Sequence, residues 1–172
     1  MKKSTPPPLK FLFAHPAHFI ACGCGSGLSA FAPGTVGTLF AWLTFPLFGL
    51  LLPDTTTTFA ALTIFFILGI FAADITGRHL GVADHGSIVW DEIVPFWTVL
   101  MFLPAGYSLA ALGWQLLAFL LFRFFDIVKP FPANWFDARL KNGLGVMMDD
   151  VVAAGYTVFA LAVARQIGDR LW

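Results

Sequence analysis

The sequence has few charged residues and few cysteines, and each shortage excludes a class of protein. Charged residues make up 12% of the 172 residues and hydrophobic residues 58%. A soluble domain has about 25% charged residues, so this chain lacks the polar side chains needed to cover a water-exposed globule. The formal net charge is zero, which argues against a nucleic-acid-binding protein. The two cysteines, Cys22 and Cys24, are too close for an ordinary disulfide, and no second pair could complete a zinc site.

Long apolar stretches without charge predict that the chain crosses a membrane several times as helices. They span residues 36–52, 59–73, 93–103, 109–125 and 151–167. They lack the two-residue alternation of membrane barrel strands. Several are shorter than the roughly 20 residues of a straight span, so they extend into flanking polar residues or are partly buried in a bundle. We therefore expect an all-α, multi-pass integral membrane helical bundle, formed as a single domain by residues 1–172.

The N-terminus has some features of a signal peptide, but the sequence argues against cleavage. Three lysines precede an apolar stretch that two histidines and Pro16 interrupt, and Pro33 would directly follow the cleavage-like Ala-Phe-Ala. Residues 1–14 are therefore interpreted as a basic cytoplasmic segment. Pro16 suits the first turn of a short helix running to about Cys22. This helix is too short to cross the bilayer, so we expect it to be interfacial or re-entrant.

A threading that alternates from a cytoplasmic N-terminus places the charged segments on one face. The segments 74–92 and 123–150 then both lie on the cytoplasmic side, together with most of the cations, as the positive-inside rule prefers. Arg165 and Arg170 fall on the outside, which is a mild violation of that rule.

Eight of the ten carboxylates lie between Asp74 and Asp150. Acids next to lipid are costly and need partners, which are usually cations or metal ions. The pair Asp91 and Glu92 follows Ser87, a plausible helix cap, and Asp149 and Asp150 precede the last apolar stretch. A solvated pair or acids favoured by a helix dipole are the structural alternatives. Metal ligation explains both pairs better, because the threading brings them to one face.

Arg123, Asp126 and Lys129 are spaced three residues apart, which places them on one face of a helix. One interpretation is a salt-bridge ladder at the membrane border. The functional interpretation is a metal-binding acid flanked by two phosphate-binding cations. His85, next to Asp84, could act as a general acid or base, although it could equally be an ordinary loop histidine.

A glycine-rich segment offers backbone N–H groups to a phosphate at the start of the first span. Close packing of helices through small residues explains this composition equally well. The candidate substrate-binding residues of this segment are Gly25, Ser26, Gly27, Pro33, Gly34, Thr35, Gly37 and Thr38.

Together these motifs resemble the phosphatidylglycerophosphatase A family of bacterial membrane lipid phosphatases. The stretches that carry the resemblance are GSGLSAFAPGTVGTL from Gly25, DHGSIVWDE from Asp84, and RFFDIVKPFPANWFD with GLGVMMDD from Arg123 to Asp150. Ala30 departs from the proline expected in the first stretch. The resemblance implies a compact all-helical fold in the bacterial inner membrane. It also implies Mg²⁺-dependent removal of the terminal phosphate from phosphatidylglycerophosphate, which gives phosphatidylglycerol.

On this interpretation the expected site residues form two overlapping sets. The expected Mg²⁺ ligands are Asp91, Glu92, Asp126, Asp149 and Asp150. The expected catalytic residues are Asp84, His85, Asp91, Glu92, Asp126, Arg123 and Lys129. Metal-activated water is the leading nucleophile, because the chain has no Cys-x5-Arg loop and no Asp-x-Asp motif.

Two other classes of membrane protein also use intramembrane acids. A CDP-alcohol phosphotransferase would need an Asp-Gly-x2-Ala-Arg signature, whereas Asp137 is followed directly by Ala138 and Arg139. An acid-lined ion carrier would place its acids mid-span, whereas these acids are expected at helix ends on one side of the membrane.

Overall fold

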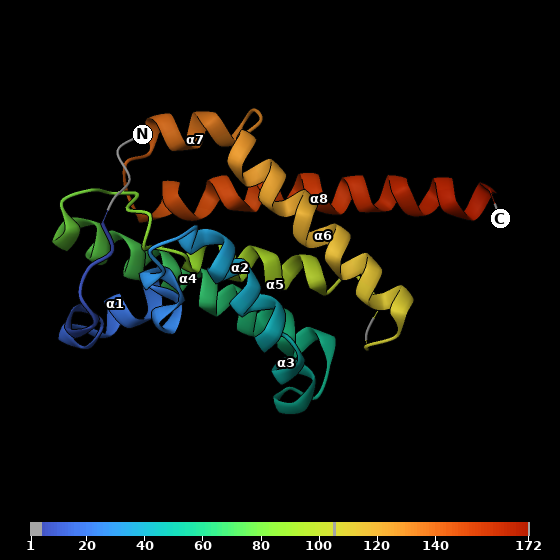
Figure 1. The fold of residues 1–172 in the computed structure, drawn as a ribbon, viewed down its shortest axis with the longest axis horizontal. Helices are drawn as coiled ribbons and strands as arrows, with labels where there is room; N and C mark the ends of the chain where they lie inside the picture. The colour runs from blue at the N-terminus through green and yellow to red at the C-terminus, as the bar shows by residue number, and fades with distance from the viewer. Residues whose placement is uncertain (1–4, 105, 172) are drawn as a thin grey trace.

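The computed structural model describes residues 5–104 and 106–171, except for the side chains of Asp137 and residues 168–171. The described residues form helices and no strand (Figure 1), which confirms the all-α prediction. The elements in chain order are η1 Leu9–Ala14, α1 Pro16–Ala21, η2 Gly23–Leu28, α2 Pro33–Thr44, α3 Pro46–Leu51, α4 Thr55–Leu80, α5 Trp90–Leu100, α6 Leu109–Val128, α7 Ala133–Arg139 and α8 Gly143–Leu171.

Four helical segments of the described chain are long and apolar enough to cross a membrane. They are Pro33–Leu51, which combines α2 and α3, Thr55–Leu80, Leu109–Val128 and Gly143–Ile167. These segments confirm the prediction of a multi-pass membrane bundle. Each is longer than its apolar core because polar residues extend the helix, as Asp54 does by capping α4 through the Thr57 backbone N–H at 2.9 Å.

The central helix of the bundle is α5, which contacts α2, α4, α6 and α8. Its eleven residues extend about 16 Å, roughly half of the 30 Å hydrocarbon thickness. The predicted span at 93–103 is therefore a short buried helix followed by a loop. Ile93, Phe96 and Val99 are completely buried, so protein rather than lipid surrounds this helix.

Two indole groups attach α5 to its neighbours. The Trp90 indole N–H donates to the carbonyl of Phe65 on α4 at 3.0 Å. The Trp97 indole N–H donates to the carbonyl of Ala41 on α2 at 2.8 Å. Both indoles satisfy their single donor inside the apolar core, which fixes the rotation of α5 about its own axis.

The charged connections gather at one end of the bundle. Figure 1 shows the α4–α5 connection, α7 and the start of α8 at the same end of the long axis as α1. The predicted short helix at Pro16 is confirmed as α1, which packs against α4. There the His18 side chain contacts the Phe11 carbonyl at 2.9 Å and the His79 ring at 2.7 Å. Its interfacial or re-entrant position and the cytoplasmic orientation stay predictions.

The start of α8 is held tightly against α4. A Cβ atom at Gly143 would lie 1.9 Å from the Ile70 carbonyl oxygen, which belongs to the backbone and cannot rotate away. The Gly143 N–H also donates to the Asp74 carboxylate at 3.4 Å, while Asp74 pairs with Arg78 at 2.5 Å. This contact is possible only for glycine and places the first turn of α8 beside α4.

We expect Gly143→Ala to lower the melting temperature of the purified protein. Overpacking of this kind costs about 1–3 kcal/mol, and each kcal/mol lowers the melting temperature of a chain of this size by about 2–4 °C. Thermal unfolding in detergent measures the change. Gly155→Ala on the same helix is the matched control, since a Cβ there would meet nothing within 4 Å. Equal melting temperatures for the two variants would contradict the packing.

Candidate active site

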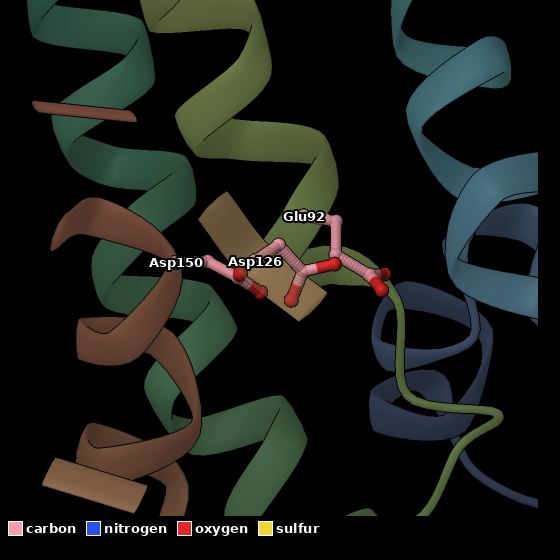
Figure 2. A group of neighbouring side chains, drawn as sticks. All are labelled: Glu92, Asp126 and Asp150. Atoms are coloured by element: carbon pink, nitrogen blue, oxygen red, sulfur yellow. The ribbon is translucent and has the colours of Figure 1, made fainter. Parts of the chain in front are cut away.

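Three acids from three different helices converge at the charged end of the bundle. Glu92 comes from α5, Asp126 from α6 and Asp150 from α8, and each offers a carboxylate oxygen within 4.8 Å of the other two. Figure 2 shows these three side chains pointing toward one another. The spacing would allow one metal ion to contact all three carboxylates. We call these residues the acidic triad.

The start of α5 positions Glu92 without a side-chain cap. The helix begins at Trp90 after Val89, so the prediction that Ser87 caps this helix is wrong. The preceding loop is held by other bonds: the Val89 N–H donates to the Ala21 carbonyl at 2.9 Å, and the Ser87 N–H donates to the His85 ring at 3.2 Å. The loop thus fixes the first turn of α5 through its backbone.

Arg123 is the cation of the acidic triad. Its Nη1 lies 2.6 Å from Asp126 Oδ2 and 3.2 Å from Glu92 Oε1. The Asp126 contact confirms that residues 123 and 126 share a helical face. The same Nη1 lies 3.5 Å from the hydroxyl of Thr38, which in turn donates to the Gly34 carbonyl at 2.9 Å. Arg123 therefore connects α2, α5 and α6 at the triad.

Several buried carboxylate oxygens have no hydrogen-bond partner among the described residues. They are Asp91 Oδ1, Glu92 Oε2, Asp149 Oδ1 and Asp150 Oδ1. An unpaired buried carboxylate is unfavourable unless a cation compensates for its charge. The donors are all oxygens, which suits hard cations such as Mg²⁺. The residues present therefore fit a divalent metal ion.

The position of Asp149 and Asp150 rules out a simple helix-dipole explanation. These acids were expected just before the last helix, but α8 begins at Gly143, and its first turn contains no acid. The dipole effect fades beyond the first turn. Asp149 and Asp150 are nevertheless only 4% and 3% exposed. Their burial requires specific partners instead.

Lys129 pairs with acids outside the acidic triad. It ends α6 in the left-handed conformation, with φ of 47°. Its ammonium group forms an ion pair with Asp149 and lies 4.0 Å from Asp84 Oδ2. Asp91, also a predicted metal ligand, is buried but is not part of the group of three. Metal ligation by Asp91 or Asp149 and phosphate binding by Lys129 stay predictions.

His85 is buried next to the exposed Asp84. Burial lowers the pKa of His85 below its ordinary value, and the charge of Asp84 opposes this shift only in part. The ring therefore favours the neutral form at pH 7. Its Nδ1 accepts from the Ser87 N–H, which leaves Nε2 to carry the proton. The proposed acid–base role of the two residues stays a prediction.

The glycine-rich segment lies beside the acidic triad but makes many packing contacts. A Cβ at Gly34 would lie 1.9 Å from Glu92 Oε1, so the absence of a side chain lets α2 approach the triad. A Cβ at Gly27 would lie 2.2 Å from the Ser87 carbonyl oxygen, and a Cβ at Gly37 would lie 2.8 Å from the Cβ of Val89. These contacts favour the packing interpretation for the three glycines.

The other candidates of this segment lie around the same helix start. Pro33 occupies the first turn of α2 and Thr35 is half-buried near it. The Ser26 hydroxyl donates to the Gly23 carbonyl at 2.8 Å, and the neighbouring Gly25 adopts φ of 107°. Substrate binding by the segment stays a prediction. Asp137 lies in α7, and its side chain falls outside the described residues.

The family profile and two of the three relatives described here carry the same name. Residues 19–165 match the sequence profile described as Phosphatidylglycerophosphatase A. The protein of that name in Haemophilus influenzae is 46% identical over 155 residues, which cover 88% of this chain and 90% of the relative. The protein of that name in Escherichia coli is 39% identical over 143 residues, which cover 81% of this chain and 78% of the relative. A "Putative phosphatidylinositol-3-phosphatase" of Bacteroides thetaiotaomicron is 41% identical over 156 residues, covering 86% and 92%. No solved structure matches the chain significantly.

Gly34→Ala tests the contact between α2 and the acidic triad. The added methyl group would displace the flexible end of Glu92 and leave the backbone in place. We expect the folded protein to bind divalent cations about tenfold more weakly, which corresponds to the loss of roughly 1.4 kcal/mol. The measurement is the shift of the melting temperature with added Mn²⁺. Gly49→Ala, where a Cβ would meet nothing within 4 Å, should behave as wild type.

Proposed function

The chain belongs to the phosphatidylglycerophosphatase A family, and we propose that it removes the terminal phosphate of phosphatidylglycerophosphate to give phosphatidylglycerol. The observation that supports this activity most directly is the acidic triad, two of whose acids pair with Arg123. Three carboxylates suit a divalent cation, and the guanidinium group suits a phosphate. The four apolar helical segments keep the acyl chains of such a substrate in lipid next to this site.

Glu92, Asp126 and Asp150 would hold Mg²⁺, with Asp91 and Asp149 as the further ligands that the sequence suggests. When bound, Mg²⁺ neutralises charge on a phosphate oxygen and lowers the pKa of a water molecule. Arg123 keeps two acids oriented through Nη1, and its guanidinium group is of the kind that donates to phosphate oxygens.

Hydrolysis forms one bond between the water oxygen and phosphorus and breaks the bond to the glycerol oxygen, which leaves as a hydroxyl. The water loses one proton during attack and the leaving oxygen gains one. Neutral His85, together with Asp84 at the edge of the site, is suited to accept the first proton. The surrounding glycine segment is suited to contact the glycerol portion through backbone N–H groups.

The alternative functions have less support. The signature of a CDP-alcohol phosphotransferase is absent from the sequence. An ion carrier would need acids along a path through the membrane, whereas the triad acids form a single group where α5 begins and α6 ends. The relative named for phosphatidylinositol 3-phosphate makes that lipid the most informative competing substrate.

Phosphate release by the purified protein tests this function. We expect release from phosphatidylglycerophosphate that EDTA abolishes and Mg²⁺ restores, because the donors of the triad are all hard oxygens. Faster release from phosphatidylinositol 3-phosphate would change the proposed substrate. Full activity without metal would exclude the metal-dependent reaction.

Substitution of each triad carboxylate by the corresponding amide tests whether phosphate release depends on the acidic triad. Glu92→Gln, Asp126→Asn and Asp150→Asn should each reduce turnover by about 10²-fold or more, which corresponds to losing roughly 3 kcal/mol of electrostatic stabilisation. The control is Asp54→Asn, at the exposed cap of α4, since asparagine caps a helix as well as aspartate. A similar loss of turnover at Asp54 would contradict the assignment.

We propose that residues 1–172 form one domain in the bacterial inner membrane with the site on the cytoplasmic face. Single cysteines at three exposed positions test the orientation, in a background without Cys22 and Cys24. Positions 86 and 142 lie at the charged end, and position 56 lies at the start of α4. In intact cells a membrane-impermeant thiol reagent should label position 56 only. Labelling of positions 86 and 142 but not of 56 would reverse the topology.

A further inference from the structure

Lys129 carries a positive charge next to two acids, Asp84 and Asp149, that are not part of the acidic triad. Its ammonium group forms an ion pair with Asp149 Oδ2 and lies 4.0 Å from Asp84 Oδ2. Asp149 is almost completely buried, and its second oxygen has no hydrogen-bond partner among the described residues. The charge of Lys129 therefore compensates a carboxylate that would otherwise need another cation.

The backbone of Lys129 indicates that its side chain is required at this position. The residue that follows a helix in the left-handed conformation is usually glycine, because other side chains are disfavoured there. Lys129 adopts this conformation with φ of 47° at the end of α6. The unfavourable backbone is explained if the conformation directs the ammonium group toward α8 and Asp149.

The two neighbouring acids of α8 have different partners for a simple geometric reason. Consecutive residues of a helix point about 100° apart. Asp150 joins Glu92 and Asp126 in the triad, whereas Asp149 pairs with Lys129. The acids are thereby divided into one group centred on Arg123 and one held by Lys129.

We propose that Lys129 is a resident cation that occupies a latent second metal position formed by Asp84 and Asp149. Asp149 then binds the ammonium group in place of the Mg²⁺ contact that the sequence suggests for it, and the acidic triad alone binds a divalent ion. Lys129 is then a positioning residue, and it contributes no direct contact to phosphate. A single positive charge on a tethered side chain replaces an exchangeable second ion. This inference rests on the proposed metal site of the triad.

Counting bound Mn²⁺ by electron paramagnetic resonance on the full-length protein in detergent tests the inference. The wild type should bind one ion per chain. Lys129→Met should bind two, because it removes the ammonium group that lies next to the carboxylates of Asp84 and Asp149. Lys129→Arg should bind one, since it retains the positive charge. The double variant Lys129→Met/Asp149→Asn should also bind one, because it loses the buried carboxylate together with its partner.

Each result has a distinct meaning. Two ions in the wild type, or one in Lys129→Met, would overturn the role of Lys129 as a resident cation. A Lys129→Met variant that binds one ion and only raises KM for the substrate would identify Lys129 as a phosphate ligand instead. No bound ion in the wild type would overturn the metal triad and, with it, this inference.

If Lys129→Met folds poorly, its melting temperature is compared with that of the double variant Lys129→Met/Asp149→Asn. The double variant should then have the higher melting temperature of the two, because it no longer buries an uncompensated charge. Equal instability of the single and double variants would overturn the pairing of Lys129 with Asp149.

Discussion

Burial of carboxylates in an apolar bundle is the constraint on which the rest of the structure depends. Asp91, Asp149 and Asp150 are each at least 95% buried in a chain with only 12% charged residues. Such groups are tolerated only beside compensating charge. Arg123 supplies part of that charge at the triad and Lys129 supplies it at Asp149. The carboxylate oxygens that have no hydrogen-bond partner among the described residues are the atoms that could bind a metal ion.

The apolar scaffold meets this constraint by holding one short helix in its centre. Because α5 packs against α1, α2, α4, α6 and α8, its first turn brings Glu92 next to the end of α6 and the N-terminal part of α8. Glycine at position 34 lets α2 close over the same point. The tryptophans of α5 fix its rotation through single hydrogen bonds. The precision of the acidic triad therefore depends on packing against α2 and α4, neither of which supplies an acid to it.

Pattern and composition predicted the helical class and the short helix at Pro16. They also predicted the three acids that lie together, but Asp91 and Asp149, which were predicted with them, are not in that group. These features follow from local hydrophobicity and from the need to keep charge out of lipid. The start of α8 was missed because apolar content begins at Val151, whereas the helix already forms at Gly143 through its contact with α4. The cap at Ser87 failed because tertiary hydrogen bonds to Ala21 replaced it. Likewise, three-residue spacing suggested a shared face for Lys129 but could not reveal its turn toward α8.

The distribution of the triad over α5, α6 and α8 has a consequence for biosynthesis. The ribosome delivers Glu92 and Asp126 to the membrane before it has made Asp150, which lies in the last helix. A nascent chain can therefore be fully inserted up to α7 and still lack a complete acidic centre. The helix that completes the centre also packs against α4, α5, α6 and α7. Assembly of the acids and completion of the bundle are thus the same event, and an unfinished chain in the bilayer has an incomplete acidic triad.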